Sequence, residues 1–235
     1  MSNKLKPSAD RKVWAYNNQK NTFGLLPGPE GTCPGATMGP GGCRTVVGKN
    51  RPDCYVYRLM SIFKGVRNVL EHNTKLLREA TPEEQIELLN AEIERFKNVH
   101  KNGVLAADKY RLHWAGDIFN RQYAESLRAM MLTHSDIQFW TYTRTFDVID
   151  VFKDVDNLKL YLSLDDCNAQ EGLDIYNKQK WSNLHLCYLG DDKPPEEVGS
   201  FIACPVDEGT IALEGACQKC KLCLRGHNIW FKTKR

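Results

Sequence analysis

Residues 137–164 read IQFWTYTRTFDVIDVFKDVDNLKLYLSL and contain a strand, a short helix and a second strand in succession. Aromatic and aliphatic residues dominate 137–143 and 158–164, whereas 146–152 has the apolar spacing of a short helix. Strands that alternate with helices along a chain favour a parallel sheet. The same alternation extends outward in both directions, with further strands predicted at 110–115, 184–189 and 201–204 and further helices at 121–132 and 169–180.

A sixth strand is predicted near the N-terminus, where TFGLL at 22–26 leads into a loop rich in cysteine, glycine and proline. Six strands are enough for a partial barrel and two short of an eight-stranded one. We therefore predict an α/β fold with a TIM-barrel-like, partial parallel (βα)6 barrel over 21–203, although an open doubly wound sheet fits the same strand count. The other predicted segments are a polar arm at 1–20, a cysteine-rich loop at 32–57 and a cysteine-rich, metal-binding C-terminal extension at 204–235.

Two helices are predicted between the cysteine-rich loop and the second strand. Apolar residues at three- and four-residue spacing favour a helix over 57–77. The helix over 82–100 opens with Thr81 as N-cap, Pro82 at the first helical position and Glu84 at the third. This arrangement is typical of a capping box.

The composition limits the setting and the class of protein. The chain has 235 residues, of which 42% are hydrophobic, so it can bury a sizeable core. It has no apolar run long enough to span a bilayer, and it begins with the charged segment MSNKLKPSADRK, so we expect no membrane span, no signal peptide and a cytoplasmic location. In a reducing compartment its nine cysteines indicate metal binding more than disulfides. The net charge of +3 is too small to predict nucleic-acid binding by itself.

The first group of thiols is Cys33, Cys43 and Cys54, in the loop at 32–57. Glycine and proline permit tight turns in this loop, and a bound metal can offset the entropy lost when such a loop becomes ordered. A structural zinc site closes with four ligands, whereas three ligands leave one position open, as in a catalytic site. The alternative is three free, half-buried thiols.

Four late cysteines form the second group, with the spacing C-x12-C-x2-C-x2-C: Cys204, Cys217, Cys220 and Cys223. The run CQKCKLC places three thiols within seven residues, as in the iron–sulfur sites of bacterial ferredoxins. Zinc could take the same four ligands, with His227 as a substitute. Cys167 and Cys187 fall outside both groups and are expected to be small buried hydrophobic residues.

Polar residues follow the predicted strands, at the edge where ligands bind in parallel α/β sheets. Gly116 and Asp117 follow the strand at 110–115, and Arg144 and Asp165 follow the next two strands. We take Arg144 and Asp165 as candidate catalytic residues and expect Arg144 to bind an anionic group. The alternative is that these residues serve only turns and N-caps.

The ordered motifs TFGLL, TCPGAT, CYVYR, RLHWAGDIFN, FWTYTR, ACP and CQKCKLC resemble a cysteine-rich family found largely in phages, gene product eighty-eight. The resemblance runs from about residue 22 to the C-terminus and implies no assigned activity. More distantly, three cysteines after the first strand of a six-stranded partial barrel are similar to the layout of radical S-adenosylmethionine (SAM) enzymes.

The more distant resemblance implies an iron–sulfur enzyme that uses an external electron donor. In it, Cys33, Cys43 and Cys54 would hold a [4Fe-4S] cluster whose fourth iron binds SAM. Ala115-Gly116-Asp117 would contact the SAM amino group, with Tyr55 as the aromatic residue beside the third cysteine. The late cysteines would hold a second [4Fe-4S] cluster. A phage setting implies a small-molecule or nucleotide substrate, or a nucleic-acid base, in the host cytoplasm.

Two other functions fit parts of the sequence. A zinc- or iron–sulfur-containing nucleic-acid-binding protein would use the basic C-terminal residues, with Trp230 and Phe231 stacking on bases. A base-exchange enzyme similar to tRNA-guanine transglycosylase would combine the barrel with a late zinc site. The metal content separates these hypotheses.

Overall fold

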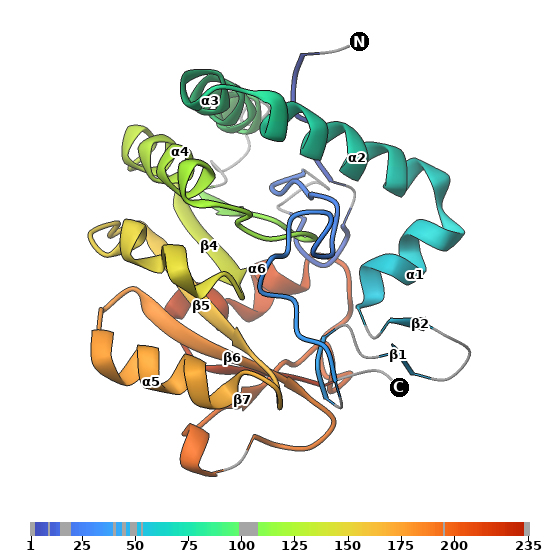
Figure 1. The fold of residues 1–235 in the computed structure, drawn as a ribbon, viewed down its shortest axis with the longest axis vertical. Helices are drawn as coiled ribbons and strands as arrows, with labels where there is room; N and C mark the ends of the chain where they lie inside the picture. The colour runs from blue at the N-terminus through green and yellow to red at the C-terminus, as the bar shows by residue number, and fades with distance from the viewer. Residues whose placement is uncertain are drawn as a thin grey trace.

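A computed structural model describes residues 3–8, 10–14, 20–39, 41–43, 46–47, 51–52, 54–98, 108–194 and 196–232. Its centre is a curled, all-parallel sheet of six strands that forms half of a barrel (Figure 1), in the order β3-β4-β5-β6-β8-β7. The strands are β3 (Lys109–Arg111), β4 (Gln138–Thr143), β5 (Leu158–Leu164), β6 (Leu184–Gly190), β7 (Ile202–Ala203) and β8 (Ile229–Lys232).

The two faces of the sheet are set by the two-residue period of a strand. In β5, Leu158, Leu160, Leu162 and Leu164 pack in the main core, whereas Tyr161 points to the opposite face. Both faces of the central strands are therefore covered, which accounts for their nearly continuous apolar sequence. We call the face that carries Tyr161 the concave face.

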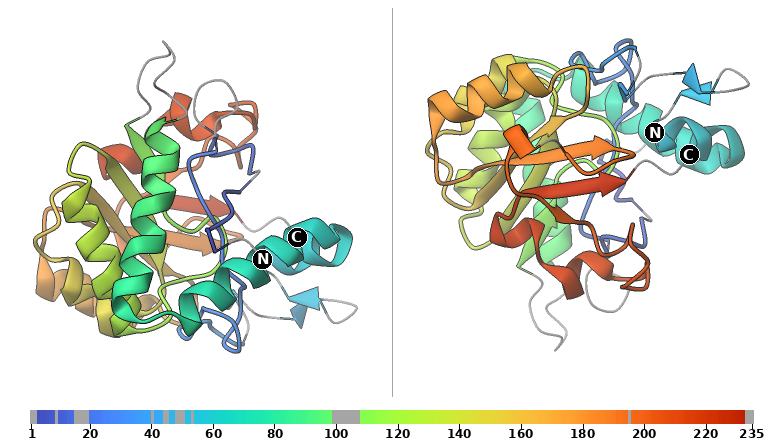
Figure 2. Two further views of the ribbon diagram at one scale, coloured as in Figure 1. Left: turned by 90° about the horizontal axis from the view of Figure 1, so that it is seen from above. Right: turned by 90° about the horizontal axis from the view of Figure 1, so that it is seen from below.

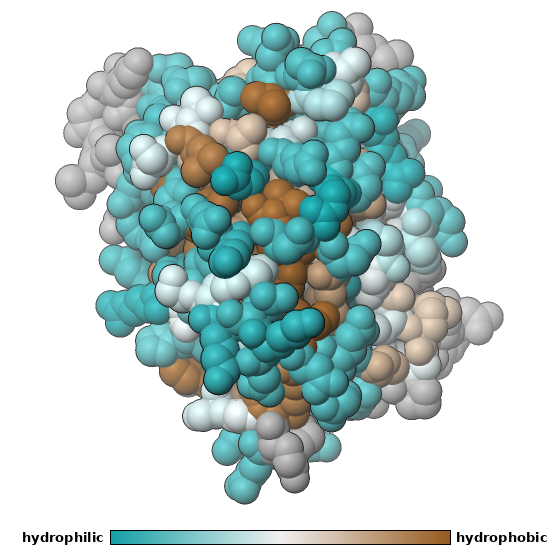
Figure 3. Space-filling view, turned by 60° about the vertical axis from the view of Figure 1, so that its left-hand side comes forward, coloured by the Kyte–Doolittle hydropathy of each residue, from teal (hydrophilic) through white to brown (hydrophobic). Residues whose placement is uncertain are grey.

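Helices cover the other face of the sheet (Figure 1), and the surface over them is mostly hydrophilic with apolar residues between (Figure 3). These elements are α3 (Pro82–Asn98), α4 (Arg121–Thr133), the 3-10 helix η2 (Phe146–Phe152) and α5 (Ala169–Gln179). The capping box is confirmed at the start of α3, because the Thr81 N–H donates to the Glu84 carboxylate at 2.8 Å and the Glu84 N–H donates to the Thr81 hydroxyl at 3.3 Å. The predicted end of this helix, at 100, lies outside the described residues.

The helix predicted over 57–77 is two helices, α1 (Tyr55–Ile62) and α2 (Lys64–Glu79). The break lies at Phe63, whose φ of −117° and ψ of 97° are extended. The apolar spacing continues through the break, so the hydrophobic pattern alone could not reveal it. Two short antiparallel strands, β1 (Val46–Val47) and β2 (Arg51–Pro52), precede α1.

The N-terminal segment packs against the body of the protein instead of forming the predicted polar arm. Leu5 and Val13 are buried, and Val13 packs with Trp140 and Leu224 on the concave face. Figure 2 shows this segment and the C-terminal residues together on the side of the strands away from α4 and α5. The predicted strand TFGLL lies beside β3 without forming a full strand, through a parallel bridge of Thr22 with Arg111 and further backbone hydrogen bonds, such as that from the Trp114 N–H to the Phe23 carbonyl at 3.1 Å. Residues 15–19 of the predicted arm lie outside the described residues.

The C-terminal residues complete the sheet and are not an appended extension. The α-helix α6 (Ala216–Cys220) and the 3-10 helix η4 (Cys223–Arg225) lead into β8, which lies between β6 and β7. Trp230 in β8 packs against the main core and Phe231 packs on the concave face. Both rings are half-buried within the fold and do not lie on a separate tail, and their stacking on bases stays a prediction.

The strand order confirms only part of the predicted architecture. The sheet is parallel and curled, but β8 separates β6 from β7, so a regular (βα)6 barrel is not shown. Within the described part of the chain, no helix is both long and apolar enough to cross a membrane.

Candidate functional site

The cysteine-rich loop is fastened to the carboxyl ends of β4 and β5, an edge that we call the rim. Asp165, just after β5, accepts hydrogen bonds from the Thr37 hydroxyl and from the Cys43 N–H, the latter at 3.0 Å. The Arg144 guanidinium, just after β4, lies 2.5 Å from the same carboxylate oxygen. One buried carboxylate therefore joins the loop to two strand ends.

The Arg144–Asp165 pair is almost closed to solvent, with side chains 8% and 0% exposed. The loop also approaches the backbone closely here, because a Cβ on Gly35 would lie 2.0 Å from the Arg144 carbonyl oxygen. Gly35 belongs to the CPGA motif, so the motif has a steric reason for its glycine. The predicted catalytic residues lie together at the rim, and their present partners are protein groups.

Asp117 and Gly116 organise the turn after β3. The Asp117 carboxylate accepts the Ile118 N–H at 2.7 Å and the Arg144 N–H at 2.8 Å. Burial raises the pKa of Asp117 to about 6, although these hydrogen bonds oppose the shift. Gly116 has a φ of +80°, and a Cβ there would lie 2.5 Å from the Thr32 hydroxyl oxygen. Both residues thus have internal partners, and their contact with SAM stays a prediction.

Cys33, Cys43 and Cys54 come from separate turns of the chain but lie near one another at the rim. Burial raises the pKa of Cys33, followed by the negative charge of Asp117 and by the two other thiols. Burial also raises the pKa of Cys54, and Cys43 adds to that shift. Cys54 precedes α1, and Tyr55 donates its hydroxyl to the Trp114 carbonyl at 2.6 Å. Cys33 and Cys54 are therefore expected to be protonated at neutral pH.

Cys167 is a rim residue that the sequence analysis set aside as a buried hydrophobic residue. It is exposed, and its N–H donates to Asp165 at 3.0 Å. A Cβ on Gly42 would lie 3.1 Å from the Cys167 sulfur, so the thiol lies against the loop beside Cys43. The signal that could have found it is its position, two residues after Asp165 at the end of a strand.

The second group of thiols lies on the concave face. Cys204 follows β7 directly, and Cys217 and Cys223 lie in α6 and η4. Burial raises the pKa of Cys217 and of Cys223 to about 12. Cys187 of β6, also set aside from sequence, is buried in the same cluster as Cys204. Cys220 ends α6 and is half-buried.

Neither group of thiols has the geometry of a metal site. Across the residues that the structure describes, no three His, Cys, Asp or Glu side chains are close enough together to hold a metal ion. A metal at the rim or on the concave face would therefore need its sulfur ligands to draw together.

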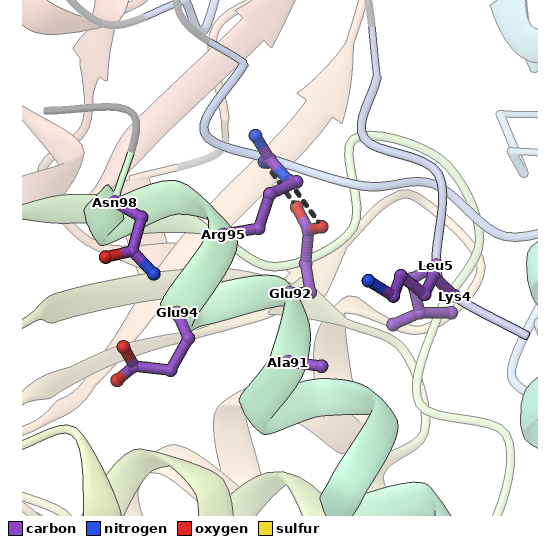
Figure 4. A pocket seen from close by; sticks show the side chains of 7 residues that line it. All are labelled: Lys4, Leu5, Ala91, Glu92, Glu94, Arg95 and Asn98. Atoms are coloured by element: carbon purple, nitrogen blue, oxygen red, sulfur yellow. Dashed lines mark hydrogen bonds and ion pairs between the residues drawn. The ribbon is translucent and has the colours of Figure 1, made fainter.

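A pocket of about 410 Å³ lies between the N-terminal segment and α3 (Figure 4). Glu92 lines it, but both of its carboxylate oxygens are engaged by Arg95, at 2.7 and 2.8 Å, and one also accepts the Tyr110 hydroxyl at 2.7 Å. The buried charge of Glu92 is therefore satisfied within the protein.

The fold and the rim define an α/β protein with a curled parallel half-barrel and a thiol-rich loop over its carboxyl edge. Residues 1–226 match the family described as Gene product 88, and the chain belongs to that family. This confirms the predicted phage family.

Two relatives match the chain over nearly its whole length. It is 31% identical to the Gene 88 protein of Mycobacterium phage L5 over 252 aligned positions, 99% of each chain. It is also 31% identical to the Gene 88 protein of Mycobacterium phage D29 over 253 positions, 98% of each chain. No solved structure matches the chain significantly. The distant resemblance to radical SAM enzymes finds no support in these matches.

Proposed function

We propose that this protein binds an iron–sulfur cluster at the rim through Cys33, Cys43 and Cys54, and that it is a radical SAM-like enzyme acting on a nucleotide or nucleic-acid base. The observation that carries the proposal is that one loop brings three reduced thiols to the carboxyl edge of a parallel sheet, beside Arg144 and Asp165. This is the edge at which such sheets bind ligands.

The chemistry of the donor set suits iron better than hard cations, because thiolates favour iron–sulfur clusters and zinc. A [4Fe-4S] cluster with SAM bound would supply reductive cleavage of SAM and a radical able to take hydrogen from a substrate. Among the described residues the sulfurs are not grouped as metal ligands, so cluster binding would have to bring them together.

The protein's own residues would have two tasks at this site. Asp165 and Arg144 hold the loop against the strand ends, so the thiols stay at the rim before metal is bound. Arg144 would also be the cation nearest an anionic substrate group. Since burial raises the pKa values of Cys33 and Cys54, metal loading must release protons and should be favoured by higher pH.

Anaerobic reconstitution with iron and sulfide tests the proposal. We expect about four iron and four sulfide per chain for a filled rim site, and about eight of each if the late cysteines hold a second cluster. Replacing Cys33, Cys43 and Cys54 together by Ser should remove about four iron and four sulfide. Stoichiometric zinc without sulfide, or an unchanged iron content in the triple variant, would contradict the iron–sulfur assignment at the rim.

The position of Cys167 favours a second candidate function, in which it closes the site as a fourth ligand. A four-thiolate centre has no open iron, so it would serve structure or electron transfer instead of SAM chemistry. Cys167→Ser distinguishes the two. The radical SAM-like proposal expects the variant to keep its iron and to show a changed electron paramagnetic resonance signal when SAM is added to the reduced protein. Loss of iron in Cys167→Ser would support the closed centre.

A further inference from the structure

Arg111 places a cation on the concave face without a matching acceptor. It belongs to β3, and its guanidinium lies 5.0 Å from the centre of the Tyr142 ring. Its Nε is buried and has no hydrogen-bond partner, and among the described residues no carboxylate forms an ion pair with it. Removing a guanidinium from water without hydrogen-bond acceptors is costly, so such a group indicates a missing anionic partner.

Lys12 brings a second cation to the same aromatic surface. Its Nζ lies 5.4 Å from the centre of the Phe231 ring, and the Phe231 and Tyr142 rings are 5.6 Å apart. Arg111 lies close enough to Lys12 for the two positive charges to repel each other. Two like charges are thus held close together, which an anion between them would relieve.

Two buried N–H donors on neighbouring segments also lack a hydrogen-bond acceptor. The Trp14 Nε1 and the Gln218 Nε2 are buried without hydrogen-bond partners. The segments that carry them lie side by side, because the Gly215 N–H donates to the Arg11 carbonyl at 2.9 Å and the Cys217 N–H to the Lys12 carbonyl at 3.0 Å. A ligand that fits this surface must bring oxygen acceptors.

Two carboxylates act on these cations, Asp207 on Lys12 and Asp10 on Arg111, but neither forms an ion pair with the Arg111 guanidinium. The Asp207 carboxylate lies 3.9 Å from the Lys12 Nζ, and Asp10 accepts the Lys12 N–H at 3.0 Å. Arg111, Lys12, Tyr142 and Phe231 are each partly exposed.

We propose that the concave face binds a small oxyanion, a phosphate or carboxylate group, between Arg111 and Lys12. The planar guanidinium can donate two parallel hydrogen bonds to such a group, and Lys12 adds a point charge. The site is separate from the rim, so failure of the rim proposal leaves it intact. A second cluster on the late cysteines would compete with the anion, because the Lys12 Nζ donates to the Cys204 sulfur at 3.6 Å.

Isothermal titration of the full chain at constant ionic strength tests this site, with inorganic phosphate and succinate as probes. We expect saturable binding of at least one probe, and the tighter probe identifies phosphate or carboxylate as the recognised group. Arg111→Met should weaken that binding by at least about tenfold, the scale of a lost hydrogen bond to a charged group. Lys12→Met should weaken it less. The control Arg121→Met removes an exposed cation that pairs with Asp150 on the helix-covered side and should not change it.

Binding to Arg111→Met as tight as to the parent, or no binding of either probe to the parent at about 10 mM, would overturn the proposal. If Arg111→Met does not fold, anion binding is measured on Arg111→Lys and Lys12→Met instead. Arg111→Lys keeps the charge but loses the planar fork. The proposal is then overturned if both variants bind like the parent.

Discussion

Asp165 is the residue on which the loop and the sheet meet. Its carboxylate is closed to solvent and accepts from Arg144, from the Thr37 hydroxyl and from the Cys43 and Cys167 N–H groups. A carboxylate with this many partners specifies one position for the loop. Its role in holding the thiols at the rim is therefore structural, whatever chemistry the rim performs.

Removing Arg144 tests that structural role. Arg144→Met should lower the free energy of unfolding by about 3 kcal/mol or more, because it leaves the buried Asp165 charge with neutral donors alone. Adding Asp165→Asn to this variant removes the charge and should recover part of the loss. Urea unfolding measures both. Asp165→Asn should also be measured in the parent. If it lowers the free energy of unfolding by the same amount in the parent and in Arg144→Met, the two residues do not act as a pair.

The burial of Asp117 makes stability depend on pH. Its folded pKa of about 6 lies above the ordinary 3.8, so between these values the folded state binds more protons than the unfolded state. Stability from this group therefore falls as the pH rises from about 4 to 6, by roughly 3 kcal/mol in total. In Asp117→Asn this contribution is absent. The stability of the variant relative to the parent should rise by that amount across the same window in urea unfolding.

Asp136 supplies a control of opposite sign. A hydrogen bond from Lys97 lowers the pKa of Asp136, so its stabilising contribution is present above the ordinary pKa and is lost as the pH falls. The stability of Asp136→Asn relative to the parent should therefore not increase between pH 4 and 6. A stability difference for Asp117→Asn that is the same at pH 4 and pH 6 would contradict the raised pKa.

At the level of elements, the sequence predicted those whose pattern is local. The strands β4, β5 and β6 and the helices α3, α4 and α5 were found within a few residues, because their apolar periods coincide with their burial. The strand β8 was missed because IWFK is short and basic residues surround it. Its burial comes from pairing with β6 and β7, which no local pattern contains.

The pairing of β7 with β8 offers a matched test of where the sheet is closed. Ile202 and Ile229 are register partners, but Ile229 is 1% exposed and Ile202 is 42% exposed. Ile229→Ala should cost about 2–4 kcal/mol through lost burial and a new cavity. Ile202→Ala should cost less than about 1 kcal/mol. Thermal or urea unfolding compares them, and equal losses would mean that β8 is not a buried strand.

At the level of the whole molecule, the sequence predicted a parallel α/β sheet with its polar residues at one edge, and the structure agrees. The number of strands was also six, but the predicted set contained TFGLL in place of β8. Strand order could not be predicted, because it depends on which strand edges are still unpaired after the first strands have paired. For the same reason Cys167 and Cys187 could be assigned to their groups only in three dimensions.

The central position of β8 has a consequence for how the protein is made. Synthesis runs from the N-terminus, and of the six strands β8 leaves the ribosome last, yet it pairs on both sides, with β6 and with β7. Until it emerges, β7 has no neighbour in the sheet and β6 exposes an open edge, which can pair with other nascent chains. The chain would therefore depend on chaperones most during this interval.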